Sequence, residues 1–271
     1  MKRWLKFLFV TAVAVIAVGA SGCARRTASN SWPRIKQDKK VVIGLDDSFV
    51  PMGFREKNGQ LKGFDIDLAK AVFKLYGIKC DFQPIEWSMK ETELKNQTID
   101  LIWNGYSATP ERAKKVAFSD DYLVNHQLLV TKTKYNVNSY ADMKGKSLGV
   151  QTGSSGAAAL DANPKALKQY IKGQDPVLYD TFTNAFLDLN AGRIQGIFMD
   201  EVYARYYVAH QPDPSSYKIL PSKGFDSEAF AVGMRKSDTE LQSKINQGFK
   251  TLEKNGTMAK LKQKWFGTDA N

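Results

Sequence analysis

Short apolar runs alternate with helical patterns along most of the chain, and the alternation occurs twice. The first series begins with a strand-like segment that enters a small-residue loop at 41–49, and it ends with an apolar strand at 99–105. The second series repeats this plan from 147–155 to 194–201. Alternating strands and helices predict an α/β fold with mostly parallel sheets. If two similar lobes point the carboxyl ends of their strands at each other, a ligand site is expected in the cleft between them.

The N-terminal segment has the pattern of an export signal. A charged stretch, "MKRWLK", precedes an apolar run, "FLFVTAVAVIAV", and small residues then lead to Cys23. The apolar run is too short for a stable membrane span and has no stop-transfer pattern after it, so residues 1–22 are expected to be a signal peptide. "ASGC" resembles a bacterial lipobox, in which the cysteine becomes the lipidated first residue. Ordinary signal cleavage beside an incidental cysteine is the alternative.

Residues 23–39 are polar and lack periodicity, so we expect a lipidated, flexible tether there. The chain of 271 residues carries a formal net charge of +11, but its lysines and arginines are scattered over helical faces. Since no nucleic-acid-binding motif or aromatic-interleaved basic patch occurs, a solvated basic surface is expected, with no nucleic acid as partner.

Composition also argues against metal and cofactor chemistry. His126 and His210 are far apart and have no partners at ligand spacing. Asp65 and Asp67 are close together, but they begin a helical pattern at 63–77, where acids complement the helix dipole. We therefore expect neither a metal site nor a bound cofactor.

The segment "NGYSATPERAKKVAFSDDY" contains an arginine in an unfavourable place. Thr109 and Pro110 fit the N-cap and first position of a helix, so Arg112 falls in its first turn. A cation there opposes the helix dipole by a few tenths to ~1 kcal/mol. Helix N–H groups together with a guanidinium form a receptor for an anion. The alternative is that Glu111 or another nearby acid pairs with Arg112 on the surface.

Taken together, these segments resemble the family 3 extracellular solute-binding proteins, which deliver polar amino acids to ABC transporters. The matching segments, in family order, are "GLDDSFVPMGF", "GQLKGFDIDLAKAV", "NGYSATPERAKKVAFSDDY", "DMKGKSLGVQTGSS", "NAGRIQGIFMDEV" and "KNGTMAKLKQKWFG". The resemblance implies two α/β lobes that close like a clam shell, the second inserted into the first, joined by strands crossing near 126–132 and 227–233. The implied first lobe comprises 40–128 and 229–271, and the second 129–228.

The resemblance also implies roles for individual residues. Arg112 would form a bidentate salt bridge to the ligand's α-carboxylate, and Asp200 would pair with its α-ammonium. For Asp200 the alternative is an N-cap of the following helix. Ser107 would donate to the carboxylate, and Ser155 would do so through its N–H or hydroxyl, with Ser154 beside it. The Gly105 carbonyl would accept from the ammonium. The loop with both serines could equally be a plain helix cap.

The residues that would contact the ligand's side chain are harder to predict. By resemblance, Phe49 would form an aromatic platform and Trp87 the facing wall, although both could simply be core aromatics. Asp46 would touch the ligand side chain. Asp47 follows it directly, and since neighbouring strand residues point to opposite faces, only one of the two is expected to face the cleft.

The implied function is that of an extracellular receptor, not an enzyme. It would bind an amino-acid zwitterion, dock on a membrane permease as a monomer, and stay lipid-anchored at the outer face of the cytoplasmic membrane or in a periplasm. A cystine-specific receptor, a dehydratase on the same fold and a sensory lobe are the alternatives. Glutamine, basic amino acids and cystine are all open as ligands.

Overall fold

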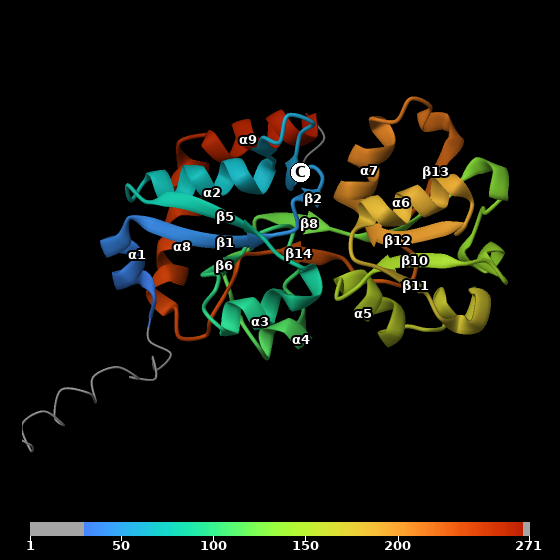
Figure 1. Ribbon diagram of the computed structural model, residues 1–271, viewed down its shortest axis with the longest axis horizontal. Coiled ribbons are helices and arrows are strands. Elements are labelled where there is room, and N and C mark those ends of the chain that lie inside the picture. Colours follow the sequence, from blue (N-terminus) through green and yellow to red (C-terminus); the bar gives the residue numbers. More distant parts are fainter. Residues whose placement is uncertain (1–29, 268–271) are drawn as a thin grey trace, which may run out of the picture.

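The computed structural model describes residues 30–267, which form two lobes lying side by side (Figure 1). Each lobe is built on a five-stranded sheet. The first sheet has the order β5-β1-β6-β15-β7 and contains β1 (Lys40–Leu45), β5 (Lys79–Pro84), β6 (Leu101–Ile102), β7 (Ala117–Phe118) and β15 (Gly233–Met234). The second has the order β11-β10-β12-β9-β13 and contains β9 (Gln127–Lys132), β10 (Leu148–Gln151), β11 (Val177–Tyr179), β12 (Gly196–Asp200) and β13 (Tyr217–Leu220).

The two sheets share one pairing pattern. β1 lies between β5 and β6 and is parallel to both, and β10 lies between β11 and β12 in the same way. The next strand of each sheet is antiparallel, β15 beside β6 and β9 beside β12. Because β15 belongs to the first sheet but follows the second lobe in the chain, the second lobe is inserted into the first. The predicted two-lobe α/β fold is confirmed.

Two crossing strands connect the lobes. β8 (Leu123–Asn125) and β14 (Glu228–Phe230) form a separate antiparallel pair, with Glu228 opposite Asn125. Figure 1 shows this pair between the two main sheets. The crossing predicted at 227–233 contains β14. The one predicted at 126–132 lies just after β8, because that stretch forms β9, a buried strand of the second sheet. The expected lobe boundaries after 128 and 228 therefore fall inside β9 and β14.

Helices cover both faces of each sheet. In the first lobe they are α1 (Trp32–Asp38), α2 (Phe64–Lys74), α3 (Lys90–Lys95), α4 (Pro110–Ala113), α8 (Thr239–Lys254) and α9 (Thr257–Phe266). In the second they are α5 (Ser155–Ala162), α6 (Phe182–Ala191) and α7 (Glu201–Ala209). A small sheet of β2 (Ser48–Phe49), β3 (Gly53–Arg55) and β4 (Leu61–Lys62) follows β1. The apolar stripe of α2, including Phe64, Leu68 and Phe73, is fully buried. Each such side chain contributes about 1.5–3 kcal/mol of burial free energy.

The prediction of a flexible tether over 23–39 is wrong for residues 32–38, which form α1. Trp32 and Ile35 are buried, and the Trp32 ring meets that of Tyr76 edge to face at 5.2 Å between centroids. Two apolar residues one turn apart are too few to reveal a helical period in the sequence. Their burial on the first lobe stabilises the helix.

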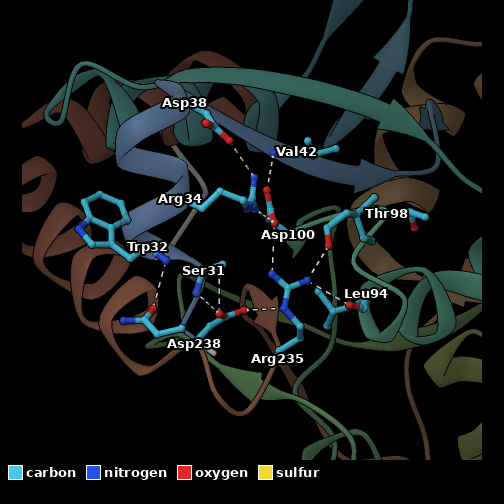
Figure 2. A network of polar contacts seen from close by, with 12 residues as sticks. Ser31, Trp32, Arg34, Asp38, Val42, Leu94, Thr98, Asp100, Arg235 and Asp238 are labelled. Carbon is cyan, nitrogen blue, oxygen red and sulfur yellow. Dashed lines mark hydrogen bonds and ion pairs between the residues drawn. The ribbon is translucent and has the colours of Figure 1, made fainter. Parts of the chain in front are cut away.

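A polar network fixes the start of α1 (Figure 2). The backbone N–H and hydroxyl of Ser31 donate to Asp238 Oδ1 at 2.7 and 2.8 Å. Arg235 pairs with Asp238 at 3.0 Å and with Asp100 at 3.1 Å, and Arg34 also donates to Asp100. α1 is thus an integral part of the first lobe.

The expected signal peptide, the lipidated Cys23 and the tether up to residue 29 lie outside the described residues. Within 30–267, none of the helices has the length and apolar character needed to cross a bilayer.

Candidate binding site between the lobes

A small cavity lies where the lobes meet, and residues of both lobes line it. The lining residues are Phe49, Trp87, Gly105, Arg112, Gln151, Ser154, Ser155 and Asp200, and the space left between them is about 10 Å³. The structure therefore brings together the residues that the sequence predicted for a ligand site, with Gln151 added. Ser107 and Asp46 lie immediately beside the lining. Ser107 Oγ is 3.0 Å from Ser155 Oγ, and Asp46 Oδ2 accepts a hydrogen bond from Gln151 Nε2 at 2.9 Å.

Arg112 is held in place by the turn that precedes it. Thr109 is the N-cap of α4, and its hydroxyl accepts from the Arg112 N–H at 3.3 Å. Pro110 occupies the first helical position, as the sequence predicted. Glu111 points away and pairs with Lys114 at 2.5 Å on the surface. Surface pairing of Arg112 with Glu111 is therefore wrong.

The Arg112 guanidinium is buried at the cavity and reaches across the lobes. Nη1 donates to the Ser107 carbonyl at 3.0 Å and Nη2 to the Gly153 carbonyl of the second lobe at 3.2 Å. The guanidinium lies 4.5 Å from the centroid of the Tyr106 ring, and Nε is 3.9 Å from Glu91. Two carbonyls, a ring and the Glu91 carboxylate thus fix the orientation of the Arg112 guanidinium, whose forked N–H groups match the geometry of a carboxylate.

Gly105 occupies a position that only glycine fits. Its φ of +56° is left-handed, and a Cβ there would stand 2.8 Å from the Phe49 ring and 3.1 Å from Phe230. Its N–H donates to Asp65 Oδ2 at 2.7 Å, and Asp65 also accepts from the Tyr122 hydroxyl at 3.0 Å. Burial raises the pKa of Asp65 to about 7. Asp65 lies in the first turn of α2 as predicted, and it also positions the Gly105 turn, which the sequence did not indicate.

Asp67 has a separate role from Asp65. It accepts hydrogen bonds from Lys264 at 2.7 Å and from the Trp265 indole at 2.9 Å. The two acids of "GFDIDL" therefore hold different parts of the first lobe.

The serine loop of the second lobe caps α5 and also touches the first lobe. Ser154 accepts from the Ala157 N–H at 3.0 Å, so the predicted cap is present. The Gly153 carbonyl just before it accepts from Lys90 Nζ at 2.9 Å as well as from Arg112. Lys90 is only 2% exposed, and burial lowers its pKa to about 8. Two cations of the first lobe thus hold one carbonyl of the second.

Asp200 ends β12 and turns its carboxylate into the site. Its Oδ1 accepts from Asn125 Nδ2 at 2.7 Å and from Gln127 Nε2 at 2.9 Å. Asp200 occupies the N-cap position of α7, as the alternative predicted, but its side chain makes no capping hydrogen bond to that helix. Burial, and then the negative charge of Glu228, raise the pKa of Asp200 to about 7. A cation bound beside it would oppose both effects.

The two predicted aromatic walls are both core and lining residues. The Phe49 ring lies 6.0 Å from that of Phe182 and 5.4 Å from that of Tyr203, both in the second lobe. The Trp87 ring meets Tyr106 edge to face at 5.9 Å. Packing fixes their orientation, which leaves one side of each toward the cavity.

The acids after β1 diverge, as expected for neighbouring residues. Asp46 is buried, and its Oδ1 accepts from the Ser48 hydroxyl and N–H. Burial raises the pKa of Asp46. Asp47 turns outward and pairs with Arg55 at 2.5 Å. Only Asp46 reaches the interface between the lobes.

Several polar residues of the site were missed by sequence reasoning. Gln127 begins β9, and Gln151 ends β10 among apolar neighbours, so a buried polar residue at a strand end was an available signal. Glu228, at the start of β14, had no such signal. Its Oε2 accepts from Ser107 Oγ at 2.6 Å, Ser155 Oγ at 2.8 Å and Gln127 Nε2 at 3.2 Å.

Comparison with known proteins identifies the family. The family model described as "Bacterial extracellular solute-binding proteins, family 3" matches residues 41–268. A crystal structure of an ABC uptake transporter substrate-binding protein from Streptococcus pneumoniae, with bound histidine, is 49% identical and superposes with a TM-score of 0.88 over 90% of this chain and 99% of that chain.

Curated relatives agree with this assignment. The arginine-binding extracellular protein ArtP of Bacillus subtilis is 31% identical over 98% of both chains. The L-cystine-binding protein TcyJ of Escherichia coli is 28% identical over 87% of this chain and 86% of its own length. The match in sequence, fold and repeated lobe plan leads to one conclusion: the chain belongs to the family 3 bacterial extracellular solute-binding proteins.

Proposed function

We propose that this chain is the substrate-binding component of an ABC importer, and that it binds a polar amino acid as a zwitterion between its lobes for delivery to a permease. One observation carries the proposal: Arg112 of the first lobe and Asp200 of the second line the same cavity. A ligand with a carboxylate and an ammonium on one carbon can pair its carboxylate with Arg112 and its ammonium with Asp200. Because it touches both lobes only when they are together, it favours the closed form, as a transport receptor requires.

The charges around the cavity favour a basic side chain. Asp46, Asp200 and Glu228 face or adjoin the site, whereas Lys90 and Glu91 pair with each other at 3.4 Å. The pKa values of Asp46 and Asp200 are raised, so these acids are easily protonated, and a cation bound beside them would favour their ionised forms. A ligand with a net positive charge supplies a second cation besides its ammonium, which places basic amino acids ahead of glutamine and cystine. The relative named for arginine and the structure with bound histidine fit this order, whereas the relative named for cystine does not.

A thermal-shift screen of the twenty amino acids with ornithine and cystine tests the proposal, because a ligand that binds only the folded state raises its melting temperature. The largest shifts are expected for basic amino acids. Calorimetry with arginine and its neutral analogue citrulline then isolates side-chain charge. Absence of any shift contradicts the receptor function, and equal affinity for the two compounds contradicts the charge preference alone. The protein is expected to leave prephenate unchanged, whereas turnover would identify a dehydratase.

Export and anchoring are also part of the proposal. Residues 1–22 would be removed and Cys23 lipidated, so that the protein acts as a monomer held at the outer face of the cytoplasmic membrane. The supporting evidence is the sequence pattern together with the extracellular family. Mass spectrometry of the mature protein should find a lipid on Cys23, and Cys23→Ser should move the protein to the unbound fraction. An unmodified mature N-terminus elsewhere contradicts lipidation, and light scattering tests the monomer.

A further inference from the structure

Glu228 occupies the junction of both lobes and the hinge, and no role has yet been assigned to it. It begins the crossing strand β14. One of its carboxylate oxygens lies 2.6 Å from Ser107 Oγ of the first lobe and 2.8 Å from Ser155 Oγ of the second. The family resemblance assigned Ser107, and Ser155 through its N–H or hydroxyl, as donors to the ligand's carboxylate.

Counting hydrogens shows a conflict with that assignment. Each hydroxyl has a single hydrogen to donate and can accept through its lone pairs. The two hydroxyls also stand 3.0 Å from each other, so three contacts share two hydrogens. Hydrogen bonds to an ionised acceptor are roughly twice as strong as neutral ones, so both hydrogens go to Glu228. Each serine then presents lone pairs, and no hydrogen, to other groups around it.

Gln127 strengthens this arrangement. Its Nε2 lies 3.2 Å from Glu228 Oε2 and 2.9 Å from Asp200 Oδ1. The Ser155 Oγ also lies 3.2 Å from this nitrogen, so the two amide hydrogens have two carboxylates and one hydroxyl oxygen as acceptors. Glu228 and Asp200 are thereby held as neighbours on one donor, and the negative potential at this end of the cavity increases.

We propose that Glu228 is a positioning residue that fixes the Ser107 and Ser155 hydroxyls as hydrogen-bond acceptors and so makes the site selective for ligands with an α-ammonium group. The inference rests on the proposed function. It assigns the ligand's carboxylate to Arg112 and to backbone N–H groups, and it assigns the serine hydroxyls, with Asp200, to the ammonium. Replacing Glu228 by glutamine removes the charge that holds the hydroxyl hydrogens, which frees them to turn toward a carboxylate.

The experiment compares amino acids with their desamino analogues by calorimetry on wild type and Glu228→Gln. Three pairs are used: histidine with imidazolepropionate, arginine with 5-guanidinopentanoate, and glutamine with glutaramate. For each amino acid that binds wild type, Glu228→Gln should lower its affinity by about tenfold relative to that of its analogue, equivalent to ~1.4 kcal/mol. The control variant Glu253→Gln removes one exposed charge from α8. It should leave the ratio of the amino acid's affinity to its analogue's affinity unchanged.

A selectivity ratio separates this role from a structural one, because loosening the hinge would weaken both members of a pair alike. Thermal unfolding confirms that each variant folds. In a Ser107→Ala background the Glu228→Gln effect should shrink, since one of the oriented hydroxyls is gone. An unchanged ratio in a folded Glu228→Gln protein overturns the proposal. Failure of wild type to bind any amino acid overturns the receptor function itself.

Discussion

Lys90 Nζ lies 2.9 Å from the Gly153 carbonyl, so a buried lysine of the first lobe holds the loop of the second lobe that carries Ser154 and Ser155. Lys90→Met keeps the aliphatic stem but removes this bond across the lobes. Amino-acid affinity should fall about tenfold, since hydrogen bonds to charged groups contribute ~1.5–3 kcal/mol. Calorimetry measures the affinity, and small-angle scattering measures closure. Lys95→Met, exposed on the same helix, is the control, and full affinity in Lys90→Met would show that the contact is dispensable.

Arg112→Lys tests the forked geometry while keeping the charge. A lysine cannot reproduce a bidentate contact with a carboxylate while also bonding the Ser107 and Gly153 carbonyls. We expect a loss of amino-acid affinity of about a hundredfold (~2.7 kcal/mol) in a protein that still folds cooperatively. Arg205→Lys replaces an exposed arginine on α7 and should bind normally. Wild-type affinity in Arg112→Lys would remove this residue from the site.

Asp200 makes binding depend on pH. Its pKa of about 7 means that the carboxylate is protonated in more acidic solution, and an ammonium needs the ionised form. Affinity should fall up to tenfold for each pH unit below 7 and level off above it. Asp200→Asn should bind weakly with a flat profile over the same range. Calorimetry from pH 5 to 8 gives both profiles, and a flat wild-type profile contradicts the assignment.

The same group affects the unliganded protein in the opposite direction. A carboxyl whose pKa is raised by folding, from 3.8 to about 7, stabilises the fold in acid and loses that contribution as pH rises through 7. The melting temperature of wild type relative to Asp200→Asn should therefore decline between pH 4 and 7. A constant difference would show that Asp200 is not buried as described.

Gly105→Ala should lower the stability of the protein by more than the strain of a positive φ alone would cause. The added methyl group would meet the Phe49 ring at 2.8 Å, in addition to the strain of a positive φ. Gly77 also has a positive φ, but a methyl group added there would have no neighbouring atom within 4 Å, so Gly77→Ala measures the strain alone. Urea unfolding should show a loss of about 1 kcal/mol for Gly77→Ala and a larger one for Gly105→Ala. Only Gly105→Ala should lose ligand affinity, and equal effects would contradict the close approach.

Asp238→Ala should weaken the attachment of α1. The substitution leaves the Ser31 N–H without its acceptor and removes one of the two carboxylates that pair with Arg235. Breaking a buried ion pair typically costs about 3–5 kcal/mol, and the remaining pair with Asp100 places the expectation near the lower end of that range. Urea unfolding measures this loss. Asp161→Ala, on the exposed end of α5, should cost under ~1 kcal/mol.

The repeated arrangement of the two sheets could be predicted because short stretches of sequence indicate each strand and the loop that follows it. β1 and β10 are short apolar strands that run into small-residue loops, and β6 and β12 are apolar strands that end in polar corners. Arg112 could be singled out because Thr109 and Pro110 fix where its helix begins. In each case the signal lies within a short stretch of sequence.

The contacts that join the lobes could not be predicted in this way. Glu228 and Ser107 are 121 positions apart, and Lys90 and Gly153 are 63 apart. Neither Glu228 nor Lys90 differs in its local sequence from an ordinary surface residue. Their burial depends on how the second lobe folds against the first, which no local pattern encodes. The same holds for α1, whose stability comes from Tyr76 and Asp238 at distant positions.

The attachment of α1 has a mechanical consequence. All the contacts of α1 described above, through Tyr76, Asp100 and Asp238, belong to the first lobe, and none involves β8 or β14. A force applied through the N-terminal segment is therefore borne by that lobe alone and does not load the crossing strands. In the opening and closing proposed above, α1 would therefore move with the first lobe, and its contacts would stay unchanged while the second lobe turns about β8 and β14.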